Sequence, residues 1–226
     1  MRLFFVSILT NVFTSHCPPA SVAYCQQLWQ HYQFKFLVAK PRRTRLGDFR
    51  VLPHNQTQIT VNANLNPYAF LITYVHEVAH AAVNRQYITQ RQVTLRGVRL
   101  RRPLPHGREW QTAFQRLMQP LLNEAVFPMI ILQPLRQYLT KPAATTSASP
   151  ALMLALRQMD ASPVTSVGEN QVLLRDVPEG EVFQLAKKTY KRGTLRRTRV
   201  VCKELSSGKS YAILAHALVS TMVNDE

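Results

Sequence analysis

The segment His76-Glu77-Val78-Ala79-His80 constrains this chain more than any other feature of its sequence. On an α-helix, residues four positions apart lie on one face about a turn apart, so both imidazoles can reach a single cation. Glu77 lies beside them, where it can take a proton from water next to that cation. With 7 histidines among 226 residues, the pattern is expected by chance only roughly 0.008 times. The segment therefore predicts a helix that carries a metal site.

The residues around this motif predict a buried helix over residues 67 to about 87. Asn66 is a favoured N-cap, and Pro67 suits the first helical position, where its missing N–H would have no partner. Apolar side chains surround the motif along this stretch: Ile72, Val75, Val78, Ala79 and Ala82. Two histidines and a glutamate on a buried helix are costly without partners, and a metal ion supplies one.

The residues alone leave the third ligand open. Catalytic zinc usually takes three protein ligands and leaves one position to water. We favour His106, because Gly107 permits a close approach and a helix that starts near Glu109 would hold the loop. Glu109 is an alternative ligand, and His54 is a weaker one. We therefore predict Zn²⁺ held by His76, His80 and His106, with Glu77 as general base. Candidates for stabilising an oxyanion are Tyr74, Tyr87 and the arginines of residues 88–105.

The neighbouring segments mix helical and extended patterns. Helical spacing predicts a helix over residues 20–32 and another that starts near Glu109 and ends or kinks at Pro120. Strands are predicted over residues 34–39, 48–52 and 58–61. The basic connector, residues 88–105, alternates apolar and polar side chains, which favours a hairpin or an extended excursion.

The composition changes after residue 140. Residues 141–150 are mainly Ala, Thr, Ser and Pro without periodicity, which is typical of a linker, and a short helix is predicted over residues 151–159. Turn residues then separate predicted strands over residues 172–174, 182–186, 199–202 and 211–214. We expect an α+β protein with a metal-binding domain over 1–140, a linker with a short helix over 141–165, and a small, basic, antiparallel β module over 166–226.

The charge of the chain indicates a polyanionic partner. Lys and Arg total 28 against 12 Asp and Glu, which gives a net charge of +16. Such an excess attracts nucleic acid, and alternating basic residues on a strand can follow a phosphate backbone. The alternative is a solvated strand face that prevents edge aggregation. The residues that we predict to contact DNA are Arg42, Arg43, Arg45, Lys187, Lys188, Arg196, Arg197 and Arg199.

The cysteines and the N-terminus bear on the compartment. The three cysteines have no C-x-x-C spacing and an odd number, so they favour a reducing, cytoplasmic environment over a disulfide framework. Residues 3–9 resemble a short signal peptide with a cleavage site at Ser21-Val22-Ala23, which would make the protein secreted. We favour an amphipathic helix that feeds the core. No stretch approaches the roughly 20 apolar residues of a membrane span, so no membrane partner is expected.

Over about residues 21–127 the sequence resembles the SprT-like metallopeptidases, relatives of the Spartan proteases. The matching residues are His76 to His80, Ile59-Thr60-Val61-Asn62, Leu65-Asn66-Pro67, His106-Gly107-Arg108-Glu109-Trp110 and the basic stretch from Lys40 to Asp48. The resemblance implies a zincin-like metallopeptidase domain with His76, His80 and His106 as zinc ligands and Glu77 as the catalytic residue. It also implies cleavage of proteins near DNA, including proteins crosslinked to DNA.

The chain departs from this family in two ways. The interval between His80 and His106 is longer than in many relatives, so the connector is an insertion or a lid. Many bacterial members end in a cysteine zinc ribbon, whereas the C-terminal module here contains a single cysteine, Cys202. Any DNA contact in this module therefore needs another mechanism. The alternative function is a non-proteolytic DNA-binding or scaffold protein with the same fold.

Overall fold

A computed structural model describes residues 12–42, 45–94, 101–160, 171–196, 199–215 and 217–221. The chain divides into two compact units, Met1–Asp160 and Ala161–Glu226. The first unit contains helices and a three-stranded sheet, and the second contains a six-stranded sheet. The α+β class predicted from the sequence is therefore confirmed. Among the described helices, none combines the length and the apolar character that crossing a membrane requires.

The N-terminal part of the first unit contributes to its core. Residues 12–16 are helical, and they lead through the 3-10 turn η1 (Pro19–Ser21) into helix α2 (Val22–Tyr32). Phe13 is fully buried, with its ring stacked on Phe36 at 5.3 Å between centroids and edge-on to Tyr74 at 5.0 Å. Cleavage at Ser21-Val22-Ala23 would remove Phe13 and cut into α2. The predicted apolar run, residues 3–9, lies outside the described residues.

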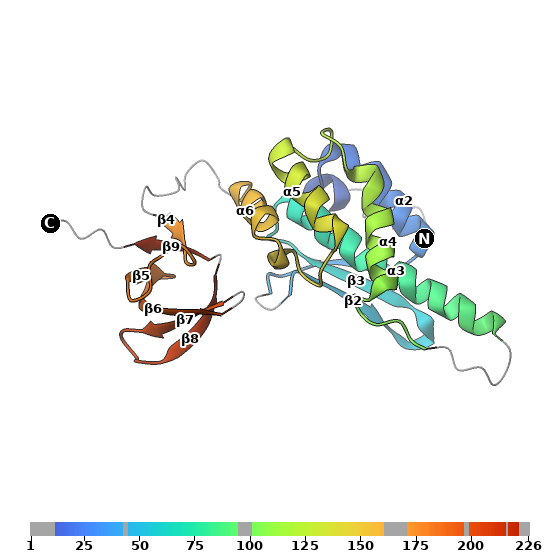
Figure 1. The fold of residues 1–226 in the computed structure, drawn as a ribbon. Helices are drawn as coiled ribbons and strands as arrows, with labels where there is room; N and C mark the ends of the chain where they lie inside the picture. Colours follow the sequence, from blue (N-terminus) through green and yellow to red (C-terminus); the bar gives the residue numbers. More distant parts are fainter. Residues whose placement is uncertain are drawn as a thin grey trace. The chain divides into compact units, whose positions relative to one another are not determined.

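The first unit contains a three-stranded sheet, and its helices pack against one face of that sheet (Figure 1). Strand β1 (Lys35–Ala39) pairs in parallel with β3 (Thr57–Asn62), and β2 (Gly47–Val51) pairs antiparallel with the other side of β3. The order β1-β3-β2 makes β2 an edge strand. The central strand β3 is buried at Ile59 and Val61, because helices cover one face of the sheet. A short 3-10 turn, η2 (Pro53–Asn55), links β2 to β3.

Helix α3 (Pro67–Val93) is the longest element of the first unit. Its start is the predicted one: the Asn66 side chain accepts a hydrogen bond from the N–H of Ala69 at 2.9 Å, and Pro67 is the first helical residue. Its end is later than predicted, because residues 88–93 continue the helix instead of entering an extended connector. Val93 is one of the apolar residues in the alternating pattern of the connector, and it is 78% exposed. At this residue the alternation therefore does not mark a buried strand. The rest of that pattern, residues 95–100, lies outside the described residues.

Three further helices and two 3-10 turns complete the first unit. Helix α4 ends just before Pro120, as predicted, and a 3-10 turn continues from it. These elements are α4 (Arg108–Met118), η3 (Gln119–Leu121), α5 (Met129–Thr140), η4 (Thr146–Ala148) and α6 (Pro150–Gln158).

The predicted linker, residues 141–165, differs from the structure over its first part. The short predicted helix exists as α6, but its Leu152, Ala155 and Leu156 are buried in the core of the first unit. The Tyr138 hydroxyl also donates to the carbonyl of Ala143 at 2.6 Å, which fastens the segment after α5. Residues 141–160 therefore belong to the first unit. Because most residues of 141–150 are small or polar, the composition did not predict that the leucines after them would be buried in the first unit.

The second unit is an antiparallel sheet with the strand order β4-β9-β5-β6-β7-β8. The antiparallel arrangement predicted from the sequence is therefore confirmed. Two of its strands, β6 and β9, were not predicted, and the basic residues of β6 explain why its extended pattern was hidden. The strands are β4 (Gln171–Leu173), β5 (Val182–Leu185), β6 (Lys188–Arg196), β7 (Arg199–Glu204), β8 (Ser210–Leu214) and β9 (Leu218–Thr221). The core of this unit comprises Leu174, Val177, Phe183, Tyr190, Val200, Cys202, Ala215 and Val219.

Candidate metal centre

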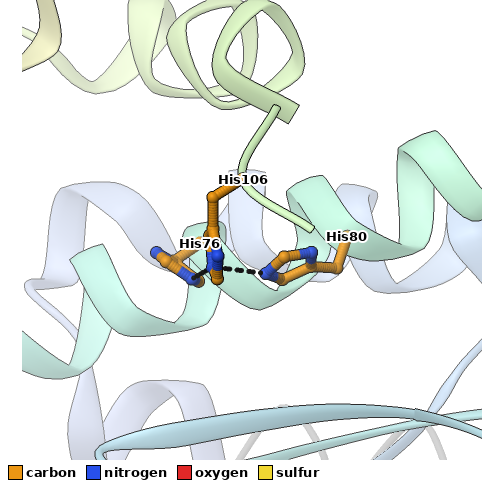
Figure 2. Close-up of side chains that lie close together, drawn as sticks. All are labelled: His76, His80 and His106. Atoms are coloured by element: carbon orange, nitrogen blue, oxygen red, sulfur yellow. Dashed lines mark hydrogen bonds between the residues drawn. The ribbon is translucent and has the colours of Figure 1, made fainter. Parts of the chain in front are cut away.

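Helix α3 presents His76 and His80 on one face, one turn apart (Figure 2). Both side chains are half-buried, while the apolar residues between and around them are fully buried in the core of the first unit. The rigid middle of a long helix therefore fixes the two imidazoles. The ring of Phe49, on the edge strand β2, stacks on His80 with 6.1 Å between centroids.

His106 reaches the same place from the segment that precedes helix α4 (Figure 2). Its backbone has φ 74°, in the left-handed region that few residues with a side chain adopt. The tight turn continues at Gly107, whose N–H donates to the carbonyl of Leu104 at 3.0 Å. A Cβ at Gly107 would lie 3.1 Å from the Leu104 Cβ and 3.2 Å from its carbonyl oxygen. The glycine thus permits the turn that aims His106 at α3.

The three imidazoles converge on one point. Nε2 of His106 lies 3.1 Å from Nε2 of His76 and 3.1 Å from Nε2 of His80, and the three potential ligand atoms lie within 4.8 Å of one another. One imidazole nitrogen carries either one proton or one lone pair, so His106 cannot satisfy both contacts well by hydrogen bonding. A tetrahedral zinc ion, with Zn–N distances near 2.0–2.1 Å, holds its nitrogen ligands about 3.3–3.4 Å apart. The donor set fits such an ion.

Electrostatics keep these histidines in the form that binds metal. Burial, followed by the neighbouring imidazoles His80 and His106, lowers the pKa of His76 to about 3. Burial and then His106 lower the pKa of His80 to about 4. The pKa of His106 is also lowered by burial. All three rings are therefore neutral at physiological pH, and a neutral imidazole has the lone pair that ligates a cation.

Glu77 lies on α3 directly after the first histidine and is only 6% exposed. Burial raises the pKa of its carboxyl to about 8, with a smaller contribution from the negative charge of Asp48, while Arg42 and Arg45 act in the opposite direction. A carboxyl with a pKa near neutrality can both accept and release a proton at physiological pH. Such a shifted group beside a metal-ligand cluster is a feature of functional sites.

Gly47, the first residue of β2, makes room for the Glu77 side chain. A Cβ at position 47 would lie 2.5 Å from the Glu77 Oε1 and 2.7 Å from the Thr73 Cγ2. Both distances are shorter than van der Waals contact, so the backbone of β2 approaches the carboxylate as closely as a glycine allows. This contact was not predicted from the sequence. The role of Gly47 beside Glu77 follows from the pairing of β2 with β3, which no local pattern reveals.

Trp110 is a further site residue that the sequence did not single out. It is 1% exposed, and its ring centroid lies 4.6 Å from that of His76, 5.6 Å from His80 and 4.8 Å from His106. Its Nε1–H donates to the backbone carbonyl of His76 at 3.3 Å. In the sequence, Trp110 appeared only within the segment that resembles the SprT-like family, without a role of its own. Its position one turn beyond His106 was the available signal for a role at the site.

The other ligand and oxyanion candidates lie elsewhere. Neither Glu109 nor His54 belongs to the group of potential metal ligands that the described residues form. The Tyr74 hydroxyl donates to the carbonyl of Cys25 at 2.8 Å and is fully buried in the core, so it cannot face a substrate. Tyr87 is on α3, about two turns beyond His80. Among the connector arginines, Arg101 and Arg102 are exposed.

The predicted DNA-contacting arginines of the first unit are engaged near the site. Nε of Arg42 donates to Oδ1 of Asn62 at 2.8 Å, and Arg45 forms an ion pair with Asp48 at 2.7 Å. The buried Asn62 amide in turn donates to the backbone carbonyls of Arg42 and Arg45. These contacts fold the basic loop against the end of β3. Arg43 lies outside the described residues.

The predicted DNA-contacting residues of the second unit differ in their surroundings. Lys188 forms an ion pair with the buried Glu204 at 2.7 Å, whereas Lys187 is exposed in the turn between β5 and β6. Arg196 and Arg199 are exposed and lie directly opposite each other on β6 and β7. Arg197 lies outside the described residues.

No protein-family model matches this chain, and neither a curated protein nor a solved structure is significantly similar to it. The interpretation of the site therefore depends on its own geometry and chemistry.

Proposed function

We propose that this protein is a zinc-dependent metallopeptidase with a zincin-like first unit, similar to the SprT-like family, that acts on proteins near or crosslinked to DNA. The observation that carries the proposal is the convergence of three neutral imidazoles beside a buried carboxyl of raised pKa. Three histidine ligands leave one position of a tetrahedral zinc ion free, which is the pattern of catalytic sites; structural zinc is closed by four protein ligands.

The residues of the chain have distinct roles in such a reaction. Zinc, when bound by His76, His80 and His106, supplies a Lewis acid that polarises a carbonyl and activates water. Glu77 would take the proton from the attacking water and return it to the leaving amine, and burial, which raises the pKa of its carboxyl, makes it a stronger base for the first transfer. Trp110 excludes water from one side of the imidazoles and fixes their orientation.

The position of β2 supports a peptide substrate. It is one of the two edge strands of the described sheet, so its outer N–H and C=O groups are available to an extended chain. Gly47 at one point of this strand lies against Glu77, and Phe49 at another lies against His80. A peptide that adds to β2 would therefore pass in front of both residues. The excess of 28 basic over 12 acidic residues supports a substrate near DNA.

The test is cleavage of casein, and of the protein itself with and without DNA, by the zinc-loaded wild type and the Glu77→Gln variant. We expect Glu77→Gln to bind zinc normally and to lose roughly 100- to 10,000-fold in turnover, the usual contribution of a general base. Glu109→Gln is the matched control, because it removes the same charge outside the histidine group, and it should retain activity.

Normal digestion by Glu77→Gln would refute the assignment of the general base. A wild type that binds zinc and DNA but cleaves neither casein nor itself would instead favour the non-proteolytic DNA-binding or scaffold protein.

A further inference from the structure

The hairpin β6–β7 in the second unit places like charges directly opposite each other. Lys191 pairs in register with Lys203, and Arg196 pairs in register with Arg199. All four side chains are exposed. Like charges at directly opposed positions of antiparallel strands are destabilising. The hairpin therefore contains two electrostatically unfavourable pairs. Because all four side chains are exposed, packing does not require charged residues at these positions.

The four residues share one face of the sheet, here called the basic face. On β7 the alternation is regular: Val200, Cys202 and Glu204 are buried, so Arg199 and Lys203 point to the other side. Lys191 and Arg196 are opposite these two residues and share their face. Five positions separate Lys191 from Arg196, an odd number that would turn them to opposite faces in a regular strand.

A β-bulge in β6 changes this spacing, so that Lys191 and Arg196 lie on the same face. The register of β6 shifts between Arg192 and Leu195, which inserts the extra residue that returns Arg196 to the side of Lys191. Gly193 permits the shift, because a Cβ there would lie 2.6 Å from the carbonyl oxygen of Val201 on β7. The bulge thus places Arg196 on the basic face, as its fourth cation.

The carboxylates of the second unit do not neutralise the basic face. Among the described residues, the acidic side chains in ion pairs are Glu204 with Lys188, Glu179 with Arg192 and Asp176 with Arg175. None of these pairs includes a residue of the basic face. The four positive charges therefore lack an internal counterion in the part of the unit that the structure describes.

We propose that the basic face binds the phosphate backbone of a nucleic-acid duplex. The proposal deepens the proposed function and rests on its nucleic-acid partner. From Arg199 to Lys203 the strand advances about 13 Å, at about 3.3 Å per residue. Along one strand of a duplex, phosphates recur about every 3.4 Å of axis, so this length spans roughly four of them. The two cations of each row can thus contact phosphates at the two ends of this stretch.

The side chains around the four cations favour a duplex over a single strand. Positions of β5 and β8 in register with this face hold Val182, Gln184, Ser210, Ala212 and Leu214. Phe183 and Tyr190 belong to the opposite side, where their rings stack at 5.6 Å in the core. Single-stranded nucleic acid is held by bases stacked on aromatic rings, and the described part of the basic face has none. Binding to the backbone without regard to sequence is the mode that remains.

The test is fluorescence anisotropy of a labelled DNA duplex of about 20 base pairs, titrated with the full-length Glu77→Gln protein at several salt concentrations. The double variant Lys191→Gln/Lys203→Gln should bind the duplex about tenfold or more weakly at low salt, and the slope of log affinity against log salt should fall in magnitude by about 2. Its melting temperature should stay the same or rise, because one opposed like-charge pair is removed.

The matched control is Arg175→Gln/Lys209→Gln, which loses the same charge at exposed positions off the basic face and should bind nearly as well as the parent. The corresponding single strand and vesicles containing phosphatidylserine are the competing probes, and both should bind more weakly than the duplex. Unchanged duplex affinity in Lys191→Gln/Lys203→Gln, an equal loss in the control, or tighter binding to either competing probe would overturn the proposal. Because binding is measured without catalysis, its failure leaves the peptidase untouched, and absence of peptidase activity leaves the basic face untouched.

Discussion

At the residue scale, Trp110 connects the candidate metal centre to the core. Its ring contacts all three imidazoles, and its Nε1–H reaches the backbone of His76. Side chains that orient metal ligands commonly change metal affinity by about 10- to 100-fold when they are altered. Trp110 is a positioning residue by this criterion, since it touches all three candidate ligands.

The Trp110→Phe variant should bind zinc about tenfold more weakly than the wild type, because it loses the hydrogen bond and part of the ring contact. Competition with a chromophoric zinc chelator measures the affinity. Trp29→Phe is the matched control: the Trp29 Nε1–H donates to the carbonyl of Phe34 at 2.9 Å on helix α2, away from the histidines. Equal zinc affinity in the Trp110 variant and the wild type would remove Trp110 from the site.

Gly47 makes a second residue-scale prediction. A methyl group at this position would overlap Oε1 of Glu77, so Gly47→Ala should displace the carboxylate while leaving the three imidazoles in place. We expect one bound zinc and a loss of roughly 100-fold in turnover, which is typical of a catalytic group misplaced by about 1 Å. Zinc content and the casein assay together measure this. Full activity in Gly47→Ala would mean that β2 is farther from Glu77 than the structure has it.

At the element scale, Lys188 of β6 and the end of β7 form an interaction that depends on pH. Hydrogen bonds from Lys188, then from Ser207, lower the pKa of the buried Glu204 to about 2, from an ordinary 4.5. A carboxyl whose pKa is lower in the folded state stabilises the fold above its unfolded pKa. That stabilisation is lost as the pH falls through 4.5 towards about 2.

The second unit should therefore lose stability between pH 4.5 and about 2, and Glu204→Gln should remove much of that dependence. Urea unfolding followed by far-UV circular dichroism measures it. Both tryptophans of the chain, Trp29 and Trp110, are in the first unit, so their fluorescence reports that unit separately. An identical acid dependence in the wild type and Glu204→Gln would contradict the account.

The elements also show how far the sequence could anticipate the fold. The start of α3 was predictable, because Asn66 and Pro67 mark it locally. Its end at Val93 was not, because residues 88–93 pack against little and carry no helical apolar period. Strand β6 was missed for a related reason: its cations lie on a solvent face, and the bulge at Gly193 breaks its alternation.

The same reasoning applies to the site. His76, Glu77 and His80 form a local motif, so their chemistry could be predicted, and Gly107 gave a reason to choose His106. The contributions of Gly47 and Trp110 depend on the pairing of β2 and on the packing of α4 against α3, both of which are tertiary. Such contacts leave no pattern in a single sequence.

At the scale of the whole molecule, the two proposed functions belong to two units with separate hydrophobic cores. One core holds the three histidines and Glu77, and the other supports the basic hairpin. The net charge of +16 includes cations of both units; Arg42 and Arg45 of the first unit are engaged by Asn62 and Asp48, whereas the four cations of the basic face form no ion pair with any described residue. The proposed peptidase chemistry and the proposed nucleic-acid contact are therefore open to independent tests.

The most direct test of the central claim is the zinc content of the purified protein, measured by inductively coupled plasma mass spectrometry after dialysis. We predict about one zinc per chain in the wild type, and loss of that zinc in His76→Ala, His80→Ala and His106→Ala. His54→Ala is the matched control and should retain it, because His54 lies outside the histidine group. A wild type without stoichiometric zinc, or a His106→Ala variant that keeps its zinc, would contradict the three-histidine site.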